Sequence, residues 1–92
     1  MQLHVKGSFN RDRKKINNKA LNKELFKRIE KMEKATTIDQ IPYFKRLIKY
    51  SHSYKSEIVS GNKIYWLLCY IFKDEIYLIR LKPESYFKKY LR

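Results

Sequence analysis

The chain has 92 residues, with 22 Lys or Arg against 9 Asp or Glu, so its formal net charge is +13 at pH 7. This length fits one domain covering residues 1–92, and 43% hydrophobic residues are typical of a globular chain rather than a disordered one. Because like charges at this density repel one another, the balance favours an anionic partner: nucleic acid, an acidic protein or an anionic membrane surface. A solvated surface that only keeps the protein soluble is the simpler alternative.

Several classes of protein are disfavoured by what the sequence contains. Cys69 is the single cysteine, which excludes a disulfide within the chain and suits a reducing compartment. Charges in residues 1–20 interrupt the apolar stretch that a signal peptide needs, and the apolar run Ile64–Phe72 is too short to span a membrane. His4 and His52 are too distant in sequence to form a zinc site with one cysteine. We therefore expect a cytoplasmic protein with no membrane association, no metal and no cofactor.

The first half of the chain predicts a short strand and two helices. In Gln2–Val5 the apolar residues Leu3 and Val5 lie on one side, which weakly predicts a short strand. Ser8 is a suitable N-cap for a helix that begins at Phe9, whose core face contains only Phe9 and Ile16. The sequence Asn17-Asn18 predicts a turn. A second helix follows, because apolar residues recur at steps of three and four: Leu21, Leu25, Ile29 and Met32, with Ala35 after them.

The second half predicts an antiparallel sheet. Thr37–Ser53 is interpreted as a connection in which Phe44–Leu47 forms one turn. Three strands are then expected, joined by the turns Gly61-Asn62 and Lys73-Asp74: Tyr54–Ser60, Ile64–Phe72 and Glu75–Leu81. Ile64–Phe72 is apolar on both faces, which is typical of a central strand covered on both sides. Glu84–Leu91 predicts a short C-terminal helix with Tyr86 and Tyr90 on one side.

The fold class expected from these elements is α+β. An N-terminal helical hairpin packs on one face of a twisted antiparallel sheet of three to four strands, and a short C-terminal helix follows. The twist makes the other face concave, and we expect basic residues to line it.

This order of elements resembles the RelE/ParE superfamily of bacterial type II toxin–antitoxin toxins. The resemblance covers nearly the whole chain through an ordered set of local patterns. FNRDRKKINNKALNKELFKRIEKMEKA is similar to the family's helical hairpin, and IPYFKRL to its loop IPNLKKL. YKSEIVSGNKIYW stands where the family has a strand, a glycine turn and a second strand. DEIYLIRL and YFKKYL are similar to its penultimate strand and its C-terminal segment.

The resemblance implies a toxin that an acidic cognate antitoxin holds inactive. Many members of the family are ribosome-dependent endonucleases that cut mRNA, whereas the ParE branch inhibits DNA gyrase by binding it. Where the family often has an arginine after the glycine turn, this chain offers Lys63 or Trp66. Where many members carry His or Arg after the last strand, it has Lys82-Pro83-Glu84. Three readings therefore stay open: an mRNA endonuclease, a gyrase inhibitor and a catalytically degenerate member.

RNA cleavage of this kind uses the 2′-hydroxyl of the substrate as nucleophile, so the protein must stabilise negative charge on phosphorus and move protons. On that logic, the candidate catalytic residues are five basic or phenolic side chains: Lys55, Lys63, Arg80, Lys82 and Tyr86. Arg80 belongs by alternation to the series of Ile76 and Leu78, so we expect it to reach the cleft from the margin of the sheet.

Each candidate has a plainer alternative. Arg80 suits a surface ion pair, Lys55 and Lys63 suit solvated positions on edge strands, and Tyr86 suits packing of the last helix. Glu57 could act as a base or pair with a neighbouring lysine, and His52 lies in a polar loop beside the expected cleft. Trp66 and Tyr70 are interpreted as core residues, with a platform for a stacked base as the alternative.

The basic residues of the helices and the connection are candidates for RNA binding. A dense positive face would grip RNA phosphates with an affinity that falls steeply with salt, or it would simply be solvated. These candidates are Arg11, Arg13, Lys14, Lys15, Lys19, Lys23, Lys27, Lys45 and Arg46.

Overall fold

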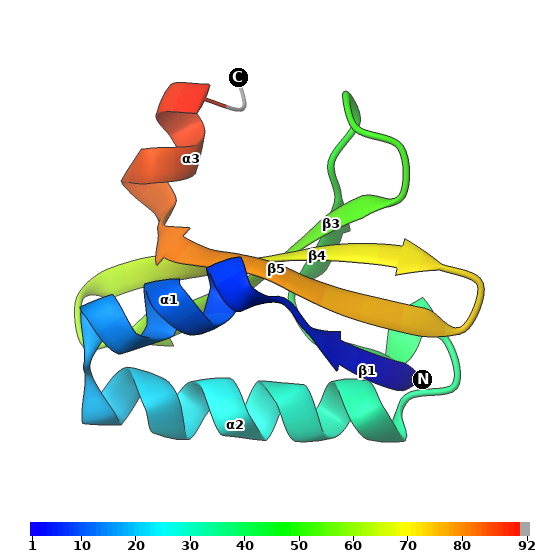
Figure 1. The fold of residues 1–92 in the computed structure, drawn as a ribbon, viewed down its shortest axis with the longest axis horizontal. Coiled ribbons are helices and arrows are strands. Elements are labelled where there is room, and N and C mark those ends of the chain that lie inside the picture. The colour runs from blue at the N-terminus through cyan, green and yellow to red at the C-terminus, as the bar shows by residue number, and fades with distance from the viewer. Residues whose placement is uncertain (91–92) are drawn as a thin grey trace.

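The computed structural model describes residues 1–90, with only the backbone described for Tyr90. Within this range the elements follow one another as β1 (Gln2–Val5), α1 (Gly7–Ile16), α2 (Lys19–Lys34), a 3-10 turn (Ile38–Gln40), β2 (Phe44–Arg46), β3 (Ser53–Ser60), β4 (Lys63–Phe72), β5 (Glu75–Pro83) and α3 (Glu84–Tyr90). The strands form a sheet in the order β1-β5-β4-β3-β2, and α2 runs beneath it (Figure 1).

The predicted α+β class is confirmed, but the sheet is larger than expected and mixed. Five strands lie in the described range, and β1 pairs in parallel with β5 from Gln2↔Glu75 to Val5↔Leu78. The chain therefore begins with a strand at the edge of the sheet, and the helical hairpin comes second. The prediction of a purely antiparallel sheet was wrong because β1 is only four residues long, and its alternation carried no sign of its partner.

The interpretation of Phe44–Leu47 as one turn was also wrong. Phe44, Lys45 and Arg46 form β2, which pairs antiparallel with β3. Lys45 stands opposite Lys55, and Phe44 stacks on Tyr54 with their ring centroids 5.1 Å apart. This strand is only three residues long, and two of them are exposed, so it is too short to show the alternation of a half-buried strand.

The hairpin of α1 and α2 agrees with the prediction except at its start. Asn18 caps α2 by accepting a hydrogen bond from the backbone N–H of Leu21, and Leu21, Leu25 and Met32 are buried. Ser8, by contrast, is not the N-cap of α1. The helix begins at Gly7, and the Ser8 hydroxyl instead donates a hydrogen bond to the carbonyl of Ile79, 2.5 Å away.

The core lies between α2 and the sheet face above it. It is built from the stripe of α2 and from alternate residues of the three long strands: Ile58, Tyr65, Leu67, Cys69, Ile71, Ile76, Leu78 and Leu81. Full burial of aliphatic side chains of this size contributes about 1.5–3 kcal/mol each. The stripe of α2 and the alternation of the strands therefore specify which face of the sheet is covered by helices.

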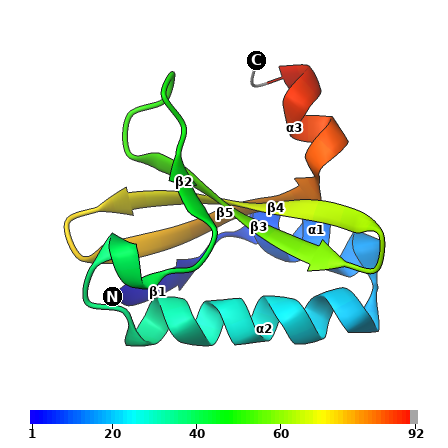
Figure 2. The ribbon, with the colours of Figure 1, turned by 180° about the vertical axis from the view of Figure 1, so that it is seen from behind.

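The opposite side of the sheet, here called the open face, is only partly covered. Two segments project from this side, α3 and the connection between β2 and β3 (Figures 1 and 2). Along β4, Trp66 is 6% exposed and stacks on Phe87 of α3, with ring centroids 5.3 Å apart. Further along the same strand, Tyr70 is 37% exposed and Phe72 is 45% exposed. The expectation that β4 is covered on both sides is therefore correct only at its α3 end, and the assignment of Tyr70 to the core was wrong.

Candidate functional site

A β-bulge in β5 places Arg80 and Lys82 on the open face. The ladder is regular from Phe72↔Glu75 to Cys69↔Leu78, and then the register shifts so that Leu68 stands opposite Arg80. Without the extra residue, Ile79, Arg80 would follow Leu78 into the core, because side chains alternate between faces along a strand. With it, Leu81 takes the core position. The placement of Arg80 in the series of Ile76 and Leu78 was therefore wrong, although the side chain does reach the open side.

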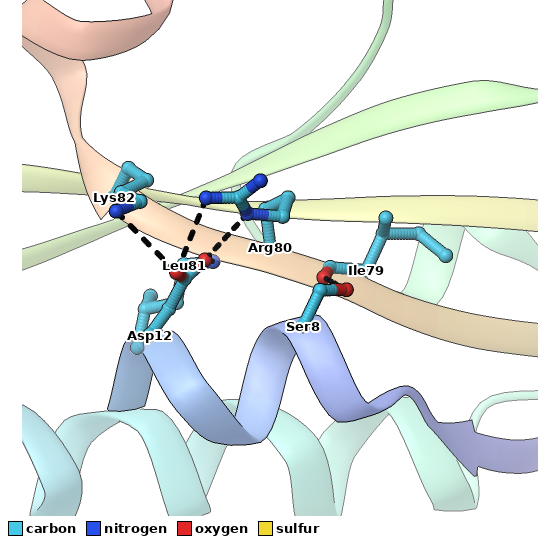
Figure 3. Close-up of polar contacts among 6 residues, drawn as sticks. All are labelled: Ser8, Asp12, Ile79, Arg80, Leu81 and Lys82. Atoms are coloured by element: carbon cyan, nitrogen blue, oxygen red, sulfur yellow. Dashed lines mark hydrogen bonds and ion pairs between the residues drawn. The ribbon is translucent and has the colours of Figure 1, made fainter. Parts of the chain in front are cut away.

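Asp12 on α1 anchors the two cations (Figure 3). Its carboxylate, only 4% exposed as a residue, accepts hydrogen bonds from Arg80 Nε at 2.8 Å and Nη2 at 3.3 Å. It also accepts the backbone N–H of Leu81 at 2.9 Å and lies 3.4 Å from Lys82 Nζ. This backbone N–H lies on the edge of β5 that β1 does not reach. One buried carboxylate therefore accepts a hydrogen bond from the unpaired edge of β5 and holds both cations in place.

The ionisation of Asp12 and Arg80 is coupled. Burial alone would raise the pKa of Asp12, but the hydrogen bonds from Arg80 and Leu81 and the nearby positive charges outweigh it, so the pKa lies below its ordinary value. The hydrogen bond to Asp12 raises the pKa of Arg80. Both groups are thus charged at neutral pH. The contacts with Asp12 use Nε and Nη2 of Arg80, and Nη1 has no part in them.

Tyr86 joins this group from α3. Its ring centroid lies 5.9 Å from Arg80 Cζ and 5.2 Å from Lys82 Nζ, within the range of cation–π attraction. The short helix is held in place by the neighbouring Phe87, which stacks on Trp66. The packing role expected of Tyr86 therefore belongs to Phe87, and the Tyr86 ring faces the two cations.

Lys55 approaches the same area from the other side of β4. Its Nζ lies 3.6 Å from the centroid of the Trp66 ring and 2.9 Å from Glu57 Oε1. Lys55 and Arg80 both stand opposite Leu68, on the strands that flank β4. Two strand spacings amount to about 10 Å. We call Lys55, Arg80 and Lys82, together with Tyr86, the cationic cluster.

The structure does not bring all predicted residues into this cluster. Lys63 starts β4 beside the Gly61 turn, opposite Ser60, and by alternation it belongs with Tyr65 and Leu67 on the helix side. Lys45 extends the row from β2, since it stands opposite Lys55, whereas Arg46 alternates away from the open face. His52 lies beside Tyr70 and Phe72, further along the open face.

The basic residues of the helices form a separate surface. Those on α2 lie on the layer opposite the open face, and those on α1 lie along the β5 edge (Figure 1). All are exposed except the half-buried Arg13; they are Arg11, Arg13, Lys14, Lys15, Lys19, Lys23 and Lys27. If RNA binds both surfaces, it must do so at two places rather than in one continuous cleft.

Sequence reasoning missed Asp12 as a member of the candidate site. The helical spacing of Phe9, Asp12 and Ile16 pointed to it, since an acidic residue within an apolar stripe needs a buried cationic partner. The missed bulge also had a signal. The apolar residues Ile76, Leu78 and Leu81 break the two-residue period at the position where Ile79 is inserted.

Within residues 1–90, no group of three or more His, Cys, Asp or Glu side chains is placed to hold a metal ion, and no helix is long and apolar enough to cross a membrane. Scanning the chain against models of protein families returns no match. Searches among curated proteins and among solved structures likewise find no similar protein. A functional assignment for this chain therefore depends on its own residues and their geometry.

Proposed function

We propose that the protein is the toxin of a type II toxin–antitoxin system and acts as a ribosome-dependent mRNA endonuclease. The observation that carries the proposal is the cationic cluster: Arg80 and Lys82 fixed by one buried carboxylate, with Tyr86 beside them and Lys55 across β4. Side chains held in fixed positions can stabilise a developing negative charge without the cost of reorganisation. The resemblance of the sequence to the RelE/ParE superfamily supports the same function.

The proposed reaction is an in-line transfer within the RNA backbone. The 2′-oxygen attacks the adjacent phosphorus and loses its proton to a base. The bond from phosphorus to the 5′-oxygen breaks, and that oxygen takes up a proton. The products are a 2′,3′-cyclic phosphate and a free 5′-hydroxyl. The pentavalent state carries extra negative charge on its phosphoryl oxygens, so cationic donors accelerate the step.

The cluster offers a group for each task. Arg80 and Lys82 contact the phosphoryl oxygens, and the Asp12 contacts keep their side chains in place. Glu57 takes the proton of the 2′-hydroxyl, and Lys55, 2.9 Å from it, positions this carboxylate. Tyr86, whose ring lies beside the two cations, donates a proton to the leaving 5′-oxygen.

The partners follow from the same proposal. Translating ribosomes present mRNA in the cytoplasm, so the proposal locates the protein there. Between reactions, an acidic antitoxin would cover the cationic cluster, since a net charge of +13 and an open face with several cations favour a negatively charged partner.

The proposal is tested by incubating the purified protein with ribosomes translating a defined mRNA and mapping the cut sites. We expect cleavage by the wild type, and a loss of about 100-fold or more for Arg80→Gln, because one fixed donor to a developing negative charge contributes a factor of this size. Lys63→Gln is the matched control, since it removes the same charge outside the cluster.

Intact mRNA with wild-type protein would refute the nuclease proposal, as would equal cleavage by the Arg80→Gln variant. A gyrase supercoiling assay run in parallel identifies the alternative. Inhibition of gyrase together with intact mRNA would assign the protein to the ParE-like mode of action.

A further inference from the structure

A continuous group of aromatic rings lies on the open face beyond the cationic cluster. Tyr70 and Phe72 on β4 contact the ring of His52, with centroids 5.7 and 5.3 Å apart. Tyr70 also contacts Tyr77 of β5, with centroids 6.2 Å apart. We call these four residues the aromatic patch. Tyr77 in turn stacks on His4 of β1, so the rings extend across the sheet from the β2–β3 connection to the edge strand.

The patch is exposed, although its residues are those that normally fill a core. Tyr70 is 37% and Phe72 is 45% exposed, and His52 is exposed on the connection that projects over this end of the sheet. The backbone fixes His52, because its carbonyl accepts the N–H of Ile71 at 2.8 Å. Tyr70 and Phe72 contact their neighbours at steep interplanar angles and are still more than a third exposed, so part of each ring is accessible to a flat ligand.

A hollow of about 240 Å³ adjoins the rings and is lined by Lys6, Tyr70, Phe72, Tyr77 and Ile79. The Lys6 ammonium lies 5.2 Å from the centroid of the Tyr77 ring, and Lys73 Nζ lies 5.5 Å from that of Phe72. Glu75 is the acidic neighbour, bonded to His4 and Tyr77. Aromatic faces bordered by cations are the combination that single-stranded nucleic acid binds, through stacked bases and neutralised phosphates.

We propose that the aromatic patch stacks bases of the single-stranded RNA whose backbone lies on the cationic cluster. This inference rests on the proposed function and names how the substrate is held. On β4 the patch begins at Tyr70, two residues beyond Leu68, the residue that stands between Lys55 and Arg80. Two residues along a strand span about 7 Å, so one RNA strand can contact both surfaces. The net charge of +13 favours a polyanion over an apolar protein segment as the occupant.

The test measures binding without cleavage. The probes are two fluorescein-labelled 2′-O-methyl hexanucleotides, one with bases and one abasic throughout; neither has a free 2′-hydroxyl to react. We expect wild-type protein to bind the base-containing probe at least tenfold more tightly. Phe72→Ala and Tyr70→Ala should each weaken that binding about tenfold and leave the abasic probe unaffected, because stacking on one ring contributes a factor of this size.

Two further variants control for folding and for apolar area. Ile64→Ala removes an apolar side chain that is 37% exposed on the same strand and face as Tyr70, and it should change neither affinity. Phe72→Leu keeps the apolar bulk without the aromatic ring, so it should weaken binding of the base-containing probe nearly as much as Phe72→Ala does. Thermal melting of each variant shows whether it is folded before its affinity is compared.

Equal affinity of the wild type for the two probes would overturn the inference, as would losses of the same size on both probes. A change in oligomeric state in the patch variants, without any change in affinity for the probes, would instead identify the patch as an interface between copies of the chain. Binding that depends on the bases, without ribosome-dependent cleavage, would support base stacking on the aromatic patch and refute the proposed nuclease activity. Failure of one proposal can therefore be distinguished from failure of the other.

Discussion

Asp12 is the residue on which the geometry of the cluster depends. It is buried, it closes the exposed edge of β5 by accepting the Leu81 N–H, and it holds Arg80 and Lys82 at fixed positions. Truncating such a residue leaves a buried donor and a partly buried cation without an acceptor. Because the edge of β5 and the cations share this one carboxylate, the stability of the fold and the geometry of the cationic cluster both depend on Asp12.

The first prediction concerns Asp12→Ala. We expect a loss of about 2 kcal/mol in the free energy of unfolding, since the Leu81 N–H and Arg80 lose their shared acceptor. Urea unfolding followed by Trp66 fluorescence measures the change. Asp39→Ala is the control, because Asp39 is exposed, and its effect should stay within about 0.5 kcal/mol. Equal effects of the two substitutions would contradict the anchoring role of Asp12.

The second prediction is the pH dependence of that difference. The pKa of Asp12 is lowered in the folded protein, so its contribution to stability is present above the ordinary value of 3.8 and is lost as pH falls through the folded value. We therefore expect Asp12→Asn to be less stable than the wild type at pH 6, with the gap closing as the pH falls below 3.8. Urea unfolding curves between pH 2 and 6 measure it. A gap that is the same at every pH would show that the Asp12 charge is not the cause.

At the scale of elements, the sequence predicted those with a strong period. The stripe of α2, the Gly61 turn and the three long strands could be located because burial of one face imposes a repeat on the residues. β2 and the parallel pairing of β1 could not be predicted. Both strands are short, and the pairing of β1 with β5 is set by contacts between residues more than seventy positions apart.

The candidate site was predictable in its residue types but not in its assembly. Arg80, Lys82 and Tyr86 could be selected because RNA cleavage needs cations and a proton donor. The bulge at Ile79, which turns the two cations outward, changes the register by a single residue. Its only trace in the residue pattern is a broken alternation. Lys63 was selected by its position after the turn, yet the pleat places it on the helix side.

The third prediction tests how α3 is attached. Phe87 is 3% exposed and stacks on Trp66, the single tryptophan, so it holds α3 and thereby Tyr86 in place. We expect Phe87→Ala to shift Trp66 emission to longer wavelength and to lower stability by about 3 kcal/mol, as for other buried phenylalanines. Ser85→Ala, an exposed substitution in the same helix, should leave the emission unchanged. An unshifted spectrum for Phe87→Ala would show that another group covers Trp66.

At the scale of the whole molecule, the positive charge is divided between two layers. The cationic cluster lies on the open face, whereas Lys19, Lys23 and Lys27 recur every four residues along α2. This helix lies on the other side of the sheet (Figure 2). Exposed charges separated by more than about 8 Å are largely screened at physiological ionic strength. On the proposed function, the two surfaces should therefore bind RNA phosphates independently of each other.

The fourth prediction follows from this division. Replacing Lys19, Lys23 and Lys27 together by Gln should weaken association with ribosomes and flatten its dependence on salt, because each lost phosphate contact removes nearly one unit from the slope of log K against log salt concentration. Affinity for the 2′-O-methyl hexanucleotide should change less than twofold. Replacing Lys45 and Lys55 together by Gln should instead weaken binding of the hexanucleotide more than association with ribosomes, since Lys45 stands opposite Lys55 on the open face. If the α2 variant lost affinity for the hexanucleotide as strongly as for ribosomes, RNA would have to reach both layers at once. The open face would then no longer be a separate binding surface.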